Sequence, residues 1–260
     1  MKIRFRLFLL LIGSANIAQA TSLLADDPML ITAHPASLLD ASNSFPTDTA
    51  AQYDLARKLL KSDSQKAFTL MKAAADQGYA EAFAGMGFFH GSGLVVEKDT
   101  AAAREWFQKG ADRGSARAQL NLGMLLLDSA TTANDKAAAL KWVEAAASQQ
   151  LPQAQNAMGE MLETGTGCEK NTTRAIEYYR QAAQRGFSPA ASHLGKILDP
   201  ATNPDPAQRV EAISWLMIAA SCHDPASEEA LANLPFKSHE QEMSEARKKA
   251  VALLAGLAGN

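Results

Sequence analysis

PQAQNAMGEMLETGTGCEKNTTRAIEYYRQAAQRGF, residues 152–187, is the stretch from which the organisation of the whole chain can be inferred. Its first half places small and apolar residues at helical spacing, a Gly165-Thr166-Gly167 turn follows, and a second apolar stripe ends at Arg185-Gly186. The pattern predicts a helix, a turn and a second helix. A shift of 36 residues repeats its key positions, which are Gly87, Gly123, Gly159 and Gly195; Ala82, Ala118, Ala154 and Ala190; and Trp106, Trp142 and Tyr178. A fixed period of this size indicates a solenoid of stacked repeats.

The recurring glycines fall in the middle of predicted helices, where glycine costs about 1 kcal/mol relative to alanine. Their recurrence at one position of the period indicates a packing contact, because two helices reach the short end of the usual ~8–10 Å separation only where a side chain is nearly absent. We expect large residues to fill the space beside the glycines and to belong to the core rather than to a ligand-binding box. These residues are Trp106, Trp142, Tyr178 and Trp215.

The first 20 residues have the composition of a secretory signal peptide. Met1–Arg6 is basic, Leu7–Ile12 is apolar, and Ala18-Gln19-Ala20 is a small-residue cleavage site. Cleavage after Ala20 would give a periplasmic or secreted protein. The apolar run is much shorter than the ~20 residues that span a bilayer, so no membrane span is expected.

The overall charge does not favour an anionic partner, and the positions of the cysteines do not favour a disulfide. Removal of Lys2, Arg4 and Arg6 with the signal peptide leaves 22 basic residues against 28 acidic ones. This balance gives no reason to expect nucleic acid or an anionic membrane surface as partner. Cys168 and Cys222 are the only cysteines. Their positions in the repeat predict a separation of roughly 20 Å, too long for a disulfide.

The rest of the chain divides around the repeats. We predict a partly disordered leader at 21–48, an N-terminal capping repeat at 49–78, four full repeats at 79–223 and C-terminal capping helices at 224–260. The predicted C-caps of second helices are Gly78, Gly114 and Gly186. The predicted N-caps of second helices are Asp99, Asp135 and Asn171.

The repeat resembles the Sel-1-like repeat (SLR) family, a branch of the tetratricopeptide-like superfamily. The third repeat carries the family pattern through Ala154, Met158, Gly159, Leu162, Gly165, Gly167, Asn171, Ala175, Tyr178, Tyr179, Ala182, Ala183 and Gly186. The resemblance implies an all-α fold, a right-handed α-solenoid of antiparallel helix pairs. It also implies a concave face, lined by the first helices, that binds another protein.

The resemblance carries candidate binding positions onto the first helix of each repeat. The early positions are apolar, and the later ones include two glutamates, which suits a protein partner with a basic flank. The alternative that Leu120, Met124 and Leu127 pack on neighbouring repeats is left open. The candidate residues are Glu81, Phe88, Arg117, Leu120, Met124, Leu127, Gln153, Asn156, Glu160, Glu163 and Lys196.

Motifs of catalysis are missing from the sequence. It contains no G-x-S-x-G, no H-E-x-x-H, no glycine-rich phosphate loop after a strand, and no S-x-x-K with K-T-G. The five histidines, His34, His90, His193, His223 and His239, lack metal-ligand spacing. We therefore expect no enzyme, cofactor or metal. SLR proteins linked to β-lactam binding are rich in cysteine, and this chain is not, so a β-lactam-binding or β-lactam-hydrolysing enzyme is a remote alternative.

Two functions of a binding protein remain. Exported SLR proteins include immunity proteins that neutralise lipase toxins delivered by type VI secretion, and this chain resembles them in its export signal and repeat number. They also include periplasmic adaptors and regulators of envelope or host-interaction processes. The sequence favours an immunity protein against a lipase or phospholipase toxin and keeps the adaptor as the alternative.

Overall fold

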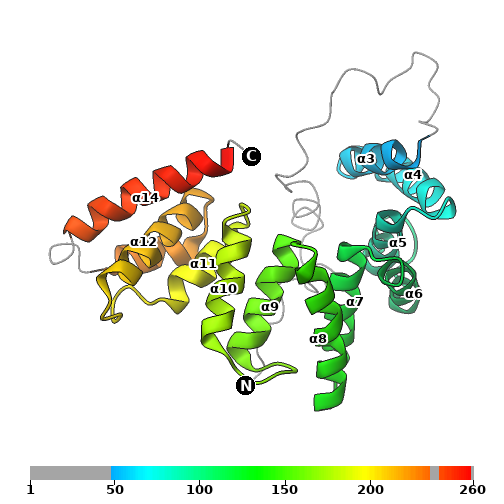
Figure 1. Ribbon diagram of the computed structural model, residues 1–260. Coiled ribbons are helices and arrows are strands. Elements are labelled where there is room, and N and C mark those ends of the chain that lie inside the picture. Colours follow the sequence, from blue (N-terminus) through cyan, green and yellow to red (C-terminus); the bar gives the residue numbers. More distant parts are fainter. Residues whose placement is uncertain (1–47, 235–239, 259–260) are drawn as a thin grey trace. The chain divides into compact units, whose positions relative to one another are not determined.

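The computed structural model describes residues 48–234 and 240–258 (Figure 1). The described residues form twelve α-helices and no β-strand. None of these helices is both long enough and apolar enough to cross a lipid bilayer. The predicted signal peptide at 1–20 and nearly all of the predicted leader at 21–48 lie outside the described residues.

The chain divides into two compact units, residues 1–146 and 147–260, with the boundary inside one helix. The helices of the first unit are α3 (Thr49–Leu59), α4 (Ser64–Asp76), α5 (Ala80–Ser92), α6 (Thr100–Ala111), α7 (Ala116–Asp128) and most of α8 (Ala133–Ser148). Those of the second are α9 (Pro152–Thr164), α10 (Thr172–Ala183), α11 (Ser188–Ile197), α12 (Pro206–Ser221), α13 (Pro225–Ala232) and α14 (Glu240–Ala258).

Helices that follow one another in sequence pack as antiparallel pairs. In the first unit α3 packs on α4 and α5 on α6, and in the second α9 packs on α10 and α11 on α12. Further contacts join α4 to α5 and α6 to α7 in the first unit, and α10 to α11 in the second. The predicted all-α solenoid of helix pairs is therefore confirmed, while the exact division into capping units and full repeats stays a prediction.

Side-chain caps begin most second helices as predicted. The Asp99 carboxylate accepts a hydrogen bond from the Ala102 N–H, and Asn171 accepts one from the Arg174 N–H. The prediction for Asp135 is wrong, because α8 begins two residues before it, at Ala133. Instead, the Thr132 hydroxyl accepts a hydrogen bond from the Asp135 N–H at 3.1 Å, and the Asp135 carboxylate accepts one from the Thr132 N–H at 2.9 Å. This reciprocal pair is a capping box, and its hydrogen bonds lower the pKa of Asp135.

The predicted glycine C-caps adopt the left-handed conformation that glycine tolerates best. Gly78, Gly114 and Gly186 have φ of 85°, 84° and 83°. The equivalent turns after α8 and α12 use other residues, Gln150 with φ 63° and His223 with φ 62°. Two turns therefore hold a residue with a Cβ in a conformation that normally favours glycine.

At the four mid-helix glycines, the second helix of each pair leaves no room for a Cβ. A Cβ at Gly87 would lie 2.3 Å from the Phe107 ring, and one at Gly159 would lie 2.5 Å from the Tyr179 ring. The atoms nearest to such a Cβ at Gly123 and Gly195 belong to Val143, at 2.7 Å, and Leu216, at 2.5 Å. The packing role predicted for these glycines is thus confirmed.

The prediction of which side chains fill this space is wrong by one residue. The contacts come from the residues directly after Trp106, Trp142, Tyr178 and Trp215. Successive side chains of a helix point about 100° apart, so only one of two adjacent bulky residues can face the partner helix. Tyr179 is fully buried, whereas Tyr178 is only partly buried.

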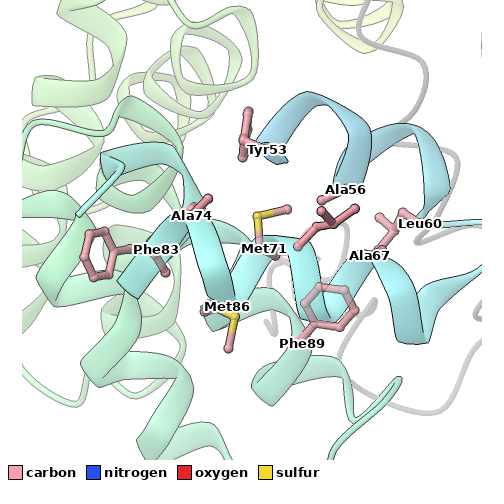
Figure 2. Close-up of a cluster of buried hydrophobic side chains, with 12 residues drawn as sticks. Tyr53, Ala56, Leu60, Ala67, Met71, Ala74, Phe83, Met86 and Phe89 are labelled. Atoms are coloured by element: carbon pink, nitrogen blue, oxygen red, sulfur yellow. The ribbon is translucent and has the colours of Figure 1, made fainter. Parts of the chain in front are cut away.

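The first unit has an apolar core between α3, α4 and α5 (Figure 2). Met71 of α4, Met86 and Phe89 of α5, and Ala56 of α3 contribute buried side chains to it. The Phe89 ring meets Phe68 edge-on, with ring centroids 5.2 Å apart. These contacts join the first helix pair to the second.

The second unit continues its packing onto the first part of α14. Ile213 of α12, Leu234, and Met243 and Ala246 of α14 form one buried cluster. The Arg209 guanidinium on α12 makes two hydrogen bonds to the Glu242 carboxylate on α14. No disulfide joins Cys168, which is partly buried, to Cys222, which is exposed.

Alanine at Gly123 tests the close helix contact. We expect Gly123→Ala to lower the free energy of unfolding by about 1–3 kcal/mol, because overpacking outweighs the ~1 kcal/mol gain in helix propensity. The new Cβ would also lie 3.0 Å from the Ala139 carbonyl oxygen, which is backbone and cannot rotate away. Gly256→Ala on α14 is the matched control, since no atom lies within 4 Å of its Cβ position. Urea unfolding measures both, and equal stability of Gly123→Ala and the natural protein would contradict the contact.

Glycine at the two unusual turn positions should stabilise the protein. We expect Gln150→Gly and His223→Gly each to raise the free energy of unfolding by about 0.5–1 kcal/mol, because the left-handed strain exceeds the entropy that glycine adds to the unfolded chain. Gly78→Ala is the reverse change, at a site with no atom within 4 Å of the added Cβ. It should lower thermal stability through backbone strain alone. A fall in stability for both glycine variants would disprove this account of the turns.

Candidate functional site

The first helices of the first unit place two predicted binding residues in contact. Helices α5 and α7 pack side by side, and the Arg117 guanidinium on α7 lies 3.5 Å from the Glu81 carboxylate on α5. Both side chains are about one quarter exposed, at 26% each. This ion pair, 36 residues apart in sequence, connects the same face of two successive repeats.

The apolar candidates of the first unit are mostly buried. Leu120 and Met124 are 2% and 7% exposed and belong to the core. Phe88 and Leu127 are partly exposed, and the Phe88 ring also contacts Phe89 at a centroid distance of 5.9 Å. Helix α7 is packed against both α5 and α6, which explains the burial of its apolar side chains. The described structure favours a packing role for Leu120 and Met124, and Phe88 and Leu127 keep surface for a partner.

In the second unit, the candidates lie on α9 and α11. Gln153 is partly buried and its Oε1 atom has no hydrogen-bond partner among the described residues, whereas Lys196 is exposed. Asn156, Glu160 and Glu163 lie close to two residues that the sequence analysis did not select, Tyr179 of α10 and His193 of α11. We call these five residues the α9–α11 cluster.

Hydrogen bonds fix the geometry of the α9–α11 cluster. The Asn156 amide donates to Glu160 Oε1 at 2.7 Å, and the Tyr179 hydroxyl donates to Glu163 Oε2 at 2.7 Å. His193 Nδ1 lies 3.1 Å from Asn156 Oδ1 and 3.6 Å from Glu160 Oε1. Because Asn156 Oδ1 can only accept, His193 carries its proton on Nδ1 and donates it to Asn156. The cluster thereby connects three helices of one unit.

Burial shifts the protonation equilibria of the cluster. It raises the pKa of Glu160 to about 7; the hydrogen bond from Asn156 opposes this shift and the Glu163 charge adds to it. Burial also lowers the pKa of His193, which is therefore neutral at pH 7. The pKa of Tyr179 is raised by burial and by its hydrogen bond to Glu163, so its hydroxyl remains a donor.

The two carboxylates of the cluster differ from other glutamates that bridge helices. Glu81 pairs with Arg117, Glu211 with Arg180 and Glu242 with Arg209, each across two helices. Among the described residues, neither Glu160 nor Glu163 forms an ion pair with a lysine or an arginine. A partly buried carboxylate without a cation is electrostatically unfavourable, and a cation from outside would improve it.

No cluster of metal-ligating side chains accompanies these groups in the described part of the chain. No three His, Cys, Asp or Glu side chains there are placed to hold a metal ion. The Ser192 hydroxyl donates to Asp224 at 2.8 Å, and Asp224 caps α13 by accepting from the Ser227 N–H. This arrangement stabilises the start of α13.

Comparison with known protein families identifies the family to which the repeat belongs. The Sel1 repeat family model matches residues 49–79, 79–115, 116–151 and 152–187, which together make up more than half of the chain. The chain belongs to the Sel1 repeat family. No match is found among curated proteins. The Sel1 repeats form a scaffold of helix pairs, in agreement with the resemblance read from the sequence.

Solved structures with the same fold include proteins of different roles. A Sel1 repeat protein from Oxalobacter formigenes is 25% identical, with a TM-score of 0.63, covering 79% of this chain and 88% of that one. A protective antigen of uropathogenic Escherichia coli with an SLR fold is 26% identical, with a TM-score of 0.61 over 82% of this chain. This Sel1 chain covers 46% of that antigen. An immunity protein from Pseudomonas aeruginosa has the same fold at 18% identity, with a TM-score of 0.53, covering 86% of this chain and 89% of that protein.

Glutamine in place of Glu160 tests the electrostatics of the cluster. The raised pKa means that the folded state holds a proton that the unfolded state loses between pH 4.5 and about 7, so stability falls as pH rises through that window. We expect Glu160→Gln to be more stable than the natural protein by about 1–2 kcal/mol at pH 8, after allowing for solvent screening of a side chain that is one third exposed. The difference should vanish near pH 4.

Urea unfolding of both proteins from pH 4 to pH 8 measures this effect. Titration of His193 occurs in both proteins, so their difference reports mainly on Glu160. A stability difference that is constant across this range would show that Glu160 has an ordinary pKa.

Proposed function

We propose that this Sel1 repeat protein is an exported, non-catalytic scaffold that binds and neutralises an antibacterial lipase or phospholipase toxin. The observation that carries the binding role is the pair of carboxylates, Glu160 and Glu163, held on α9 without a lysine or arginine partner in the described residues. A basic side chain of the toxin would supply the missing cation. The binding role thus depends on charge complementarity at a position prearranged by Asn156 and Tyr179.

The geometry of the cluster favours a guanidinium or ammonium group. Asn156 and Tyr179 each bind one oxygen of a glutamate, which leaves the second carboxylate oxygens for charge-assisted hydrogen bonds. Arrival of a cation would lower the pKa of Glu160 from about 7 and release its proton at neutral pH. Binding through this cluster should therefore weaken as pH falls below 7.

Two further observations support an immunity role. The likeness to the Pseudomonas aeruginosa immunity protein extends over nearly the whole of both chains, 86% of this one and 89% of that one. Residues 1–20 also have the sequence of a signal peptide. We propose a periplasmic or secreted location, where a toxin that attacks membrane lipids would have to be neutralised.

An envelope or host-interaction adaptor is the second candidate. The structural likeness to a protective antigen of uropathogenic Escherichia coli favours it, although this chain covers only 46% of that antigen. An adaptor would use the same first-helix residues, including Phe88, Arg117 and Lys196, for a regulatory partner. The two candidates therefore differ in the identity of the partner and in the consequence of losing it.

The test first asks whether a lipase gene neighbours the gene of this protein, and then pairs this protein with that lipase. We expect survival of Escherichia coli that exports the toxin when the full chain is co-expressed, no protection by a chain lacking residues 1–20, and co-purification in a fixed ratio. Glu160→Gln combined with Glu163→Gln should weaken toxin binding at least about 10- to 100-fold, since the loss of even one hydrogen bond to a charged group costs about 1.5–3 kcal/mol. Isothermal titration calorimetry measures the affinity.

A matched control has the same change of charge elsewhere. Glu105→Gln with Glu144→Gln alters two exposed glutamates on second helices, α6 and α8, and should bind as the natural protein does. If the full chain protects the cells but Glu160→Gln with Glu163→Gln binds the toxin with unchanged affinity, the α9–α11 cluster does not belong to the interface. No protection, together with binding of a non-toxic envelope protein, would favour the adaptor.

A further inference from the structure

Helix α14 carries an apolar surface that no described helix covers. Val251 and Leu254 are 67% and 39% exposed, and they are the only large hydrophobic side chains exposed in the described part of the chain. Large apolar side chains elsewhere in both units are buried or partly buried. This concentration on one helix indicates a binding surface rather than scattered exposure.

An adjacent face of α14 is already used for folding. Met243, Ala246 and Ala250 are buried, and the first two belong to the cluster with Ile213 of α12. Val251 points about 100° away from Ala250 around the helix, whereas Leu254, four residues after Ala250, continues the buried line beyond the cluster and is 39% exposed. Contact with α12 therefore leaves the surface around Val251 and Leu254 available.

Basic residues lie directly beside the exposed apolar ones. Arg247 and Lys248 are exposed four and three residues before Val251, a spacing that places side chains on one helix face, and Leu254 follows Val251 by three residues. We call these four residues the α14 surface. The acidic residues of this helix, Glu240, Glu242 and Glu245, all come before Arg247, and residues 250–258 contain no charge.

We propose that the α14 surface binds the anionic headgroup region of a phospholipid bilayer, with Val251 and Leu254 entering the acyl boundary. A helix lying at the interface combines basic side chains at the headgroups with apolar side chains below them. A second copy of this chain fits less well, because a stable dimer buries about 800 Å² on each partner and the surface offers only two large apolar side chains. The binding is weak and reversible, and it is independent of the toxin proposed above.

Sedimentation of the purified full protein with lipid vesicles tests the proposal. We expect binding to vesicles of phosphatidylcholine with phosphatidylglycerol, little binding to pure phosphatidylcholine, and loss of binding in high salt. Val251→Ser with Leu254→Ser should lower the partition constant about tenfold or more through lost apolar burial. Arg247→Gln with Lys248→Gln should lower it about 20-fold, at roughly fivefold for each charge near an anionic surface.

The controls separate this surface from overall charge and folding. Lys136→Gln with Lys141→Gln removes two exposed positive charges of α8 and should leave vesicle binding unchanged. Circular-dichroism melts of the α14 variants should match the natural protein, because all four side chains are exposed. Absence of binding to anionic vesicles would overturn the proposal, and so would binding that Val251→Ser with Leu254→Ser leaves intact. A dimer in light scattering that this double variant dissociates would assign the surface to a second copy instead.

Discussion

The close approach of two helices at a glycine is the contact on which each repeat depends. At Gly87, Gly123, Gly159 and Gly195, an added Cβ would come within 2.3–2.7 Å of a side chain of the following helix. The side chain that fills this space varies from phenylalanine to valine, tyrosine and leucine, whereas the glycine stays the same. The repeat therefore requires the absence of a side chain at one position more than it requires any particular neighbour.

This contact also determines which residues face solvent. The face of each first helix that carries glycine is turned towards its second helix, so other residues of the first helix meet the next first helix and the solvent. Charged residues occupy that region in both units, as Glu81 with Arg117 and as Glu160 with His193. The first pair is an arginine–carboxylate ion pair, whereas the second holds a carboxylate beside a neutral imidazole. That difference makes the α9–α11 cluster the better candidate for receiving a cation from a partner.

Much of the fold could be predicted because small residues recur at a fixed period. The helix pairs, the packing glycines and the left-handed turns at Gly78, Gly114 and Gly186 all follow from that recurrence. The residue that packs against the glycine was predicted one position too early, because Trp106 and Phe107 are both aromatic and periodicity does not distinguish them. The Asp135 cap was missed because Thr132, three residues earlier, forms a capping box with it.

The candidate site was less predictable than the fold. Glu160, Glu163 and Asn156 could be placed on a first helix from the period, but Tyr179 and His193 come from two other helices and lack a shared motif. Burial of Leu120 and Met124 depends on α5 and α6 packing against α7, which periodicity alone does not reveal. Their spacing is the same whether the helix face meets a partner or a neighbouring repeat.

We propose that a glycine-packed helix pair presents Glu160 and Glu163, which form no ion pair with a lysine or arginine among the described residues, to a protein partner. A crystal structure of the complex with the partner toxin tests whether these carboxylates lie at the interface. The account predicts an arginine or lysine nitrogen of the toxin within about 4 Å of the Glu160 or Glu163 carboxylate. A toxin bound only to the second helices, with both glutamates still facing solvent, would contradict it.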